Sequence, residues 1–241
     1  MFRVDEVGKK ALVVFSGGQD STTTLFTAIH KYGFKNILAI TFKYGQRHKV
    51  EINSARKIIR IAAKYCDKIC FRLISTGVMK EIGDSALLCD DERVSTEHKL
   101  DKSLPASFVP GRNLFFLTVA AMIAYHERIK DIFIGVSQAD FSGYPDCRDL
   151  TIKAMNVALS LGMDYQFTIH TPLMWLTKRE EVELALELPG CMEALAYSHT
   201  CYEGKYPPCG KCPACKLRAK GFEEAGVEDP LITRAREEGL L

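Results

Sequence analysis

The sequence predicts an α/β fold in which a parallel β-sheet is flanked by helices. Short apolar runs of strand length alternate along the chain with longer segments whose apolar residues recur at helical spacing. The first apolar run, residues 11–15, stops at two glycines and is followed by a helical pattern, as in a strand–turn–helix unit. The chain has 241 residues, of which 47% are hydrophobic, so it can bury one full core without disulfides.

The predicted elements alternate along the chain. Strands are expected at residues 11–15, 37–42, 69–74, 131–136 and 167–170. Helices are expected from Asp20 onward, at 52–63, 114–125 and 152–161, and from Thr177 onward, where Thr177-x-x-Glu180 has the form of a capping box. The nearly all-apolar helix at 114–125 is expected to be buried on every side. Residues 75–107 have a weak apolar pattern and are either a substrate loop or a surface excursion.

The turn Ser16-Gly17-Gly18-Gln19-Asp20-Ser21 joins the first strand to the first helix. Its glycines let the backbone approach a ligand and the helix dipole adds partial positive charge, so we expect an anion site. Asp20 and Ser21 are residue types preferred at an N-cap. The turn lacks the Lys of a Walker A loop and the third glycine of a dinucleotide fingerprint. From Gly17-Gly18 alone, a tight turn without a ligand is the alternative.

Further polar residues follow the carboxyl ends of predicted strands, where open parallel sheets bind ligands. Tyr44 is placed to stack on a base, and Arg47 or His48 to meet a phosphate, although a solvated loop explains each equally well. Arg112 precedes a buried helix and needs a carboxylate or phosphate partner; we expect a phosphate. Lys178, in the first turn of the last helix of the sheet region, is within reach of a phosphate, or is an ordinary exposed lysine.

The loop at 137–149 is rich in acidic residues. Carboxylates accept hydrogen bonds only, which suits the adjacent donors of a guanine-like base edge. An Asp-rich turn without a ligand is the alternative, because Asp and Gly favour turns. The position of the loop after a strand favours binding, and the candidates are Asp140, Tyr144, Asp146 and Asp149.

Four cysteines form a second strong signal, Cys201-x7-Cys209-x2-Cys212-x2-Cys215. Cys-x2-Cys steps recur in structural zinc sites, and four thiolates match a closed tetrahedral zinc ion. An iron–sulfur cluster is the rival, but the Cys-Pro that continues a ferredoxin run is missing. We therefore expect one structural Zn2+ per chain. The other cysteines have no such spacing and are expected to be mostly buried apolar side chains: Cys66, Cys70, Cys89, Cys147 and Cys191.

Composition excludes several classes. Thirty-two basic and thirty acidic residues give a net charge of +2, which is no electrostatic footprint for nucleic acid. The N-terminus has no apolar secretory region, and no apolar stretch reaches the roughly 20 residues of a membrane helix. Nine cysteines with four crowded together do not resemble a disulfide scaffold. We expect a cytoplasmic protein that binds neither nucleic acid nor membranes.

The Ser-Gly-Gly-Gln-Asp-Ser string after a strand resembles the signature of the PP-loop ATP pyrophosphatases, which cleave ATP between its α- and β-phosphates. Within that family the chain resembles the 7-cyano-7-deazaguanine synthases of queuosine biosynthesis over nearly its whole length. The matching segments are 15–23, 44–48, 108–113, 140–149, 171–175 and the four cysteines. The implied fold is Rossmann-like (adenine nucleotide alpha hydrolase-like), with a PP-loop domain at 1–190 and a small zinc-binding helical segment at 191–241.

The residues and the resemblance together assign a candidate site. Catalytic roles fall on Ser16, Asp20, Ser21 and Arg112. ATP contacts fall on Phe15, Ser16, Gly17, Gly18, Gln19, Asp20, Ser21, Thr22, Thr23, Tyr44, Arg47 and Lys178. Contacts to the deazapurine fall on Gln46, Arg47, Phe108, Gly111, Arg112, Asn113, Asp140, Tyr144, Asp146 and Asp149. The metal ligands are Cys201, Cys209, Cys212 and Cys215.

The resemblance implies a reaction in which 7-carboxy-7-deazaguanine and ammonia are converted to the nitrile with ATP and Mg2+. No glutaminase segment is evident, so ammonia is expected to be taken free, and the family suggests a homodimer in some members. Two other functions stay open. A PP-loop tRNA thiolase would need catalytic cysteines or an iron–sulfur cluster and a basic surface. A zinc-bearing nucleic-acid-binding protein would use the basic residues near the cysteines: Lys211, Lys216, Arg218 and Lys220.

Overall fold

The computed structural model describes residues 9–44, 50–77, 108–139 and 144–241. A five-stranded sheet of order β3-β2-β1-β4-β5 lies at its centre, and every neighbouring pair of strands is parallel. The strands are β1 (Lys10–Val14), β2 (Asn36–Lys43), β3 (Lys68–Ser75), β4 (Asp131–Ile134) and β5 (Thr168–His170). The predicted α/β class and all five predicted strands are confirmed, with shifts of one or two residues at their ends.

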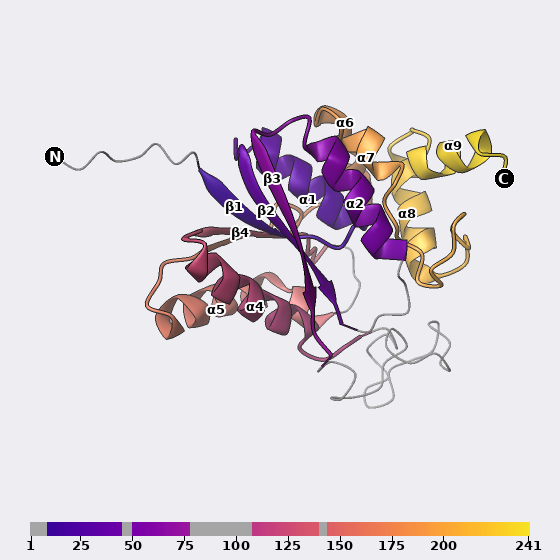
Figure 1. Ribbon diagram of the computed structural model, residues 1–241. Coiled ribbons are helices and arrows are strands. Elements are labelled where there is room, and N and C mark those ends of the chain that lie inside the picture. Colours follow the sequence, from indigo (N-terminus) through magenta and orange to yellow (C-terminus); the bar gives the residue numbers. More distant parts are fainter. Residues whose placement is uncertain (1–8, 45–49, 78–107, 140–143) are drawn as a thin grey trace.

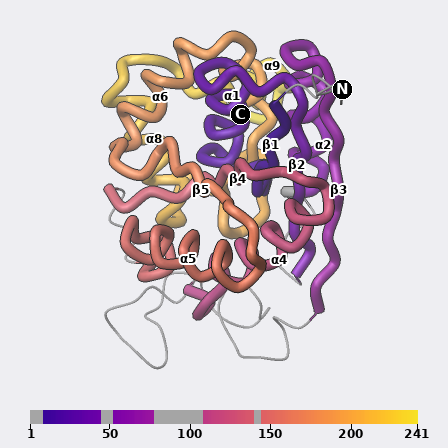
Figure 2. Tube along the Cα trace, turned by 90° about the vertical axis from the view of Figure 1, so that its left-hand side faces the viewer, coloured from indigo at the N-terminus to yellow at the C-terminus, as the bar shows by residue number. Residues whose placement is uncertain are grey.

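Helices cover both faces of the sheet (Figures 1 and 2). One face carries α4 (Arg112–His126) and α5 (Asp149–Gly162), with the short 3-10 helix η1 (Pro145–Cys147) between them in the chain. The other side of the sheet carries α1 (Gln19–His30), α2 (Val50–Ala62), α6 (Lys178–Glu187), α7 (Cys191–Leu195), α8 (Pro213–Glu224) and α9 (Pro230–Glu237). None of the described helices has the length and apolarity needed to cross a membrane.

Alternation along the strands produces this layering. Successive strand residues point to opposite faces of a sheet. In β1, Leu12 and Val14 join the apolar cluster under α4 and α5, whereas Ala11 and Val13 join the cluster under α1 and α2. The four buried residues of this central strand, Ala11 to Val14, are therefore all apolar, as expected for a strand buried on both faces.

The strand order reverses beside β1. From β1 the chain moves outward to β2 and β3, and it then crosses back to add β4 and β5 on the other side of β1. The last residues of β1 and β4 lie in register, with Val14 paired to Ile134. In open parallel sheets, ligands bind where the order reverses in this way, beyond the carboxyl ends of the two strands.

Two local predictions are wrong and one is confirmed. Helix α1 begins at Gln19 with Gly18 as its N-cap, so Asp20 and Ser21 lie inside its first turn. Helix α4 is not buried on every side, because Met122 is 52% exposed and Tyr125 is 46% exposed. Its other face alone packs on the sheet and α5. The capping box at Thr177 is present, with Thr177 Oγ1 accepting from the Glu180 N–H and Glu180 accepting from the Thr177 N–H.

The C-terminal helices pack tightly on the α/β layers. A Cβ at Gly221 of α8 would lie 2.8 Å from Lys178 Cβ, so α8 and α6 approach each other to backbone contact. Arg218 forms a two-pronged ion pair with Asp229, with N···O distances of 2.6 and 2.8 Å, which joins α8 to the start of α9. The division at residues 190 and 191 stays a prediction; α7 contributes to the same apolar cluster as α1.

Candidate active site and metal centre

The Ser21 hydroxyl organises the turn between β1 and α1. Its Oγ accepts hydrogen bonds from the backbone N–H groups of Ser16 and Gly17, each at 3.2 Å, and donates to the Gly18 carbonyl at 3.1 Å. The Ser16 hydroxyl accepts from the Gly18 N–H at 3.2 Å. Gly17 has φ of +88°, a left-handed conformation that glycine adopts without strain. The two serines therefore hold the diglycine turn in one shape.

The donors left for a ligand belong to the first turn of α1. The first N–H groups of a helix have no partner within it, and the Gly18 N-cap has no side chain to supply one. These are the N–H groups of Gln19, Asp20 and Ser21, one step along the chain from the glycines. The Gln19 side chain is 3% exposed, and its Nε2 has no hydrogen-bond partner among the described residues.

Gly135, the residue after β4, lies in close contact with the first turn of α1. A Cβ at Gly135, immediately after β4, would lie 2.9 Å from the Asp20 carbonyl oxygen and 2.9 Å from Thr24 Oγ1. Real Cβ atoms do not make such contacts, so only glycine allows this approach. The first turn of α1 thus lies directly against the carboxyl end of β4, beside that of β1.

Lys178 connects α6 to the same turn. Its Nζ lies 2.6 Å from Asp20 Oδ1 and 2.7 Å from Glu181 Oε2. The Lys178 and Glu181 side chains are 8% and 2% exposed, whereas Asp20 is 36% exposed. One buried ammonium group is therefore shared by a buried carboxylate and by a carboxylate that faces outward.

Arg112, the first residue of α4, is surrounded by aromatic and acidic groups. Its guanidinium carbon lies 5.9 Å from the centroid of the Tyr144 ring. Burial disfavours its charge, but Tyr44, Tyr144 and Asp146 outweigh burial and raise the pKa of Arg112. Tyr144 also stacks on Phe108, with ring centroids 5.9 Å apart and planes 22° apart. The stacked rings of Phe108 and Tyr144, called the aromatic wall below, therefore lie beside a cation that stays charged.

The acidic residues of the 137–149 loop have structural contacts. Asp146 is 5% exposed, and its Oδ2 accepts from the Asn113 N–H at 2.9 Å at the start of α4. Asn113 Nδ2 in turn donates to Cys147 Sγ at 3.2 Å. Asp149 pairs with Lys153 at 2.7 Å, one turn along α5. Reading of a base edge by Asp146 or Asp149 stays a prediction.

The remaining candidate binding residues have mostly structural contacts, or lie outside the residues that the structure describes. Phe15 belongs to the core, so only its backbone faces the turn. Thr22 and Thr23 are fully buried and donate to the Gly18 and Gln19 carbonyls of their own helix. Tyr44 is 9% exposed and packs at a tilt on the Phe116 ring. Gly111 is the N-cap of α4. Gln46, Arg47, His48 and Asp140 lie outside the described residues.

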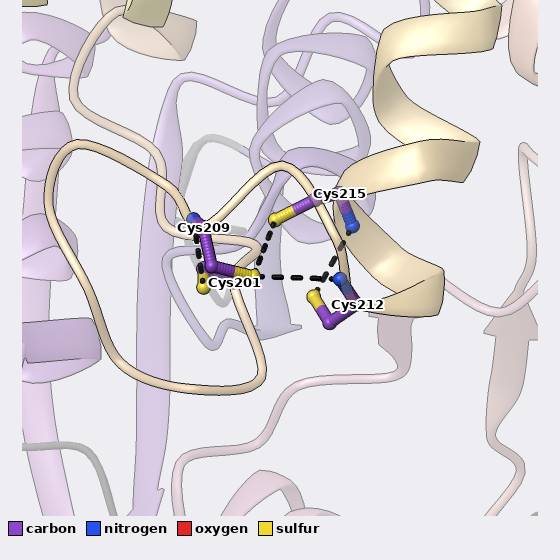
Figure 3. Close-up of side chains that lie close together, drawn as sticks. All are labelled: Cys201, Cys209, Cys212 and Cys215. Atoms are coloured by element: carbon purple, nitrogen blue, oxygen red, sulfur yellow. Dashed lines mark hydrogen bonds between the residues drawn. The ribbon is translucent and has the colours of Figure 1, made fainter. Parts of the chain in front are cut away.

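The four predicted metal ligands do come together. The Sγ atoms of Cys201, Cys209, Cys212 and Cys215 all lie within 4.8 Å of one another. Figure 3 shows Cys201 and Cys209 in the loop before α8, and Cys212 and Cys215 at the start of that helix. The sulfur atoms of Cys209 and Cys215 are 3.9 Å apart. Zinc–sulfur bonds of ~2.3 Å in a tetrahedron place the sulfurs about 3.8 Å apart, so the cluster has the size of a metal site.

The surroundings of the sulfurs suit thiolates bound to a cation. Backbone N–H groups of Lys211 and Cys212 point at Cys209 Sγ from 3.5 and 3.4 Å, and that of Cys215 points at Cys212 Sγ from 3.5 Å. Burial raises the pKa of Cys215 and of Cys212, and the crowded sulfurs add to this for Cys215. Burial alone would raise the pKa of Cys209, but the N–H donors lower it to about 7. A divalent cation would relieve this crowding of negative charge.

The other cysteines follow the expectation only in part. Cys147 and Cys191 are buried, whereas Cys66 is half-buried and Cys70 is exposed on the edge strand β3. Burial raises the pKa of Cys147 to about 12, and the neighbouring Asp146 adds to the shift. Cys147 is therefore a neutral thiol at the edge of the site and is poorly suited to act as a nucleophile.

Two residues at the site are missing from the sequence-based candidates. The His199 backbone N–H donates to the Gly17 carbonyl at 2.9 Å. The Tyr202 side chain hydrogen-bonds to Tyr144, and burial raises the pKa of Tyr202. Both lie within two residues of Cys201, one of the predicted metal ligands, and that proximity was the only signal in the sequence that pointed to them.

Comparison with known proteins assigns the family. A family model described as "Queuosine biosynthesis protein QueC" matches residues 10–226. The chain belongs to this family. It is 51% identical over 232 residues to the 7-cyano-7-deazaguanine synthase of Chromobacterium violaceum, covering 95% of this chain and 96% of that protein. It is 48% identical over 224 residues to the protein of the same name from Laribacter hongkongensis, covering 93% and 94%. The resemblance stated from the motifs is confirmed.

A solved structure also resembles this member of the QueC family. It is the U34-tRNA thiolase NcsA from Methanococcus maripaludis with its [4Fe-4S] cluster, at a TM-score of 0.47 and 17% sequence identity. The match covers 98% of this chain and 70% of the thiolase. A likeness of this size carries no conclusion about activity or about the metal.

Proposed function

We propose that this chain is a 7-cyano-7-deazaguanine synthase that activates its substrate with ATP at the N-terminus of α1. Membership of the QueC family and the names of its close relatives support the reaction. The observation that carries the location is the start of α1, which has no side-chain cap and lies at the carboxyl ends of β1 and β4, where the strand order reverses. Family membership also favours the synthase over a tRNA thiolase or a nucleic-acid-binding protein.

The proposed chemistry follows from the poor reactivity of a carboxylate, which is anionic and has no good leaving group. A carboxylate oxygen of 7-carboxy-7-deazaguanine attacks the α-phosphorus of ATP, the bond to the β-phosphate oxygen breaks, and pyrophosphate leaves. Ammonia then attacks the acyl carbon, AMP leaves with the carboxylate oxygen, and loss of a proton gives the amide. The amide oxygen attacks the α-phosphorus of a second ATP and pyrophosphate leaves; the nitrogen then loses its two protons as the C–O bond breaks, so AMP leaves with the amide oxygen and the nitrile forms.

The side chains around α1 fit these steps. The first-turn N–H groups of α1, and Gln19 Nε2, which has no partner in the part of the chain that the structure describes, are donors for phosphate oxygens. Lys178 and Arg112 are cations that would balance the charge that develops as pyrophosphate leaves. Asp20, the outward-facing partner of Lys178, is the carboxylate suited to hold Mg2+, which would neutralise phosphate charge when bound with ATP.

The aromatic wall fits a planar substrate. Phe108 and Tyr144 are stacked and lie beside Arg112, so a deazapurine ring placed on this wall would have its carboxylate within reach of a cation. We also infer that the four cysteines hold zinc in a closed structural site, with no ligand position left for chemistry. Such thiolates persist in a reducing compartment, which agrees with the expected cytoplasmic location. We propose that the protein acts there either as a monomer or as a homodimer.

A conversion assay tests the proposal. Purified protein is incubated with ATP, Mg2+, ammonia and 7-carboxy-7-deazaguanine, and the products are followed by mass spectrometry. We expect the nitrile together with AMP and pyrophosphate. An unchanged deazapurine acid would contradict the proposed function, and conversion that releases ADP and phosphate would contradict cleavage at the α-phosphorus.

A matched pair of variants tests the location. Asp20→Ala should abolish turnover with an unchanged circular dichroism spectrum. Asp67→Ala is the control, because Asp67 is an exposed carboxylate just before β3, at the amino edge of the sheet. Full turnover by the Asp20 variant would refute the assignment of the turn.

A further inference from the structure

A four-residue segment, residues 199–202, connects the metal centre to the nucleotide turn. At its first residue, the His199 N–H donates to the Gly17 carbonyl at 2.9 Å. The His199 carbonyl lies on the other glycine, since a Cβ at Gly18 would be 3.4 Å from that oxygen. The backbone of His199 therefore contacts both glycines of the turn, although it lies far from them in sequence.

The other end of the segment belongs to the metal centre. Cys201 supplies one of the four sulfur atoms. The next backbone N–H, that of Tyr202, hydrogen-bonds to the sulfur of a second ligand, Cys212. The His199 ring closes the segment on itself through a contact of 3.0 Å between Nε2 and the Cys201 carbonyl. A change in the position of the sulfurs must therefore move His199 as well.

The Tyr202 side chain carries the connection to the aromatic wall. It packs on the cysteine cluster and hydrogen-bonds to Tyr144, the ring that faces Arg112. It is also close enough to Asp20 and Arg112 to interact with their charges. One side chain thus contacts the metal centre on one side and the groups of the candidate active site on the other.

We propose that His199 and Tyr202 are positioning residues. Through them, the metal centre fixes the conformation of the diglycine turn, Gly17-Gly18, and the position of the aromatic wall. The inference rests on the proposed function, because it takes the turn and the wall as the binding surfaces for ATP and the deazapurine. It gives the metal a role beyond holding the C-terminal helices together. Loss of the metal should loosen Gly17 and Gly18 before it unfolds the α/β layers.

Two tyrosines of the same loop provide a matched test. Tyr202→Phe removes the hydroxyl that reaches Tyr144 and keeps the ring on the cluster. Tyr206→Phe is the control, since its hydroxyl bonds to Glu238 and Arg234 of the α9 region instead. We expect the Tyr202 variant to retain one zinc per chain and a wild-type spectrum, with a KM for the deazapurine acid raised about fivefold to tenfold. The control should stay within twofold of wild type.

Two results would overturn the role of Tyr202. Equal KM values for the two variants would show that the hydroxyl contact to Tyr144 positions nothing. Loss of zinc from the Tyr202 variant would assign that residue to the metal centre alone.

Amide hydrogen exchange tests the coupling without activity. Wild-type protein is compared with zinc bound, after chelation, and after zinc is restored, under conditions in which α5 keeps its protection. We expect a peptide covering residues 14–22 to exchange at least tenfold faster without the metal and to recover when zinc is added, while 149–162 is unchanged. Unchanged exchange at 14–22 would overturn the proposal.

The two possible failures are distinguishable. If wild-type protein binds zinc and shows the exchange response but does not convert the deazapurine acid, the proposed function fails and the coupling stands. If it converts the acid but shows no exchange response and no difference between the two tyrosine variants, the coupling fails alone. If chelation unfolds the whole chain, the comparison of Tyr202→Phe with Tyr206→Phe decides the matter.

Discussion

Replacing Lys178 by methionine removes an ammonium group that lies between two carboxylates. Glu181, at 2.7 Å, is 2% exposed, and Asp20, at 2.6 Å, is 36% exposed. Methionine occupies a similar volume, so the main effect is to remove the ammonium group that lies 2.7 Å from the buried Glu181 carboxylate. Breaking a buried pair in this way costs about 3–5 kcal/mol. The exposed Asp20 adds little, because water solvates it.

Urea unfolding of the metal-loaded protein, followed by circular dichroism, measures this change. We expect Lys178→Met to lower the free energy of unfolding by about 3–5 kcal/mol at pH 7.5. The penalty should shrink at lower pH, where the stranded carboxyl group can take up a proton. Adding Glu181→Gln to the variant removes the buried charge and should recover most of the lost stability.

The neighbouring residue provides the control. Arg179 pairs with Glu183 at 2.8 Å, one turn along α6, but both side chains are exposed, at 58% and 41%. Arg179→Met should therefore cost far less stability than Lys178→Met, because water solvates both members of the exposed pair. The reasoning is refuted if the Lys178 and Arg179 variants lose the same stability, or if the second substitution at Glu181 recovers nothing.

Three further predictions concern other contacts. Gly135→Ala should weaken ATP binding at least tenfold, measured by calorimetry, because its Cβ would lie 2.9 Å from Asp20 atoms; wild-type affinity would contradict the seating of α1. Cys212→Ser should release the metal and lower the unfolding temperature, and elemental analysis that finds iron, or no metal in wild type, would contradict zinc. Hydrogen bonds from Lys10 and Arg72 lower the pKa of the Glu127 carboxyl. Because the folded protein favours the ionised carboxylate, these bonds stabilise it at neutral pH, and this contribution is lost as the pH falls below about 4.5 and the carboxylate becomes protonated. Glu127→Gln should therefore destabilise by at most about 1 kcal/mol at pH 7 and match wild type in acid unfolding below that range; a constant difference would exclude this cause.

Apolar periodicity located the strands and helices correctly, but it did not predict which of their faces are buried. It placed all five strands, and most clearly β1 and β2, whose residues are buried on both faces of the sheet and are therefore mostly apolar. It failed for α4, where an apolar helix leaves Met122 and Tyr125 exposed, because composition does not report what lies next to a helix. Residue preference, in turn, pointed to Asp20 and Ser21 as N-cap residues, whereas the N-cap is Gly18 and the Ser21 hydroxyl accepts hydrogen bonds from the Ser16 and Gly17 N–H groups.

The sequence by itself determined the α/β class, the diglycine turn, the capping box at Thr177 and the cysteine ligand set. Each of these is a local pattern, in which residues that act together are close along the chain. Only the tertiary structure decided that Lys178 meets Asp20, 158 residues away, and that His199 holds Gly17. Such contacts depend on strand order and on how α6 and the cysteine loop pack across the sheet, and no spacing within one segment encodes them.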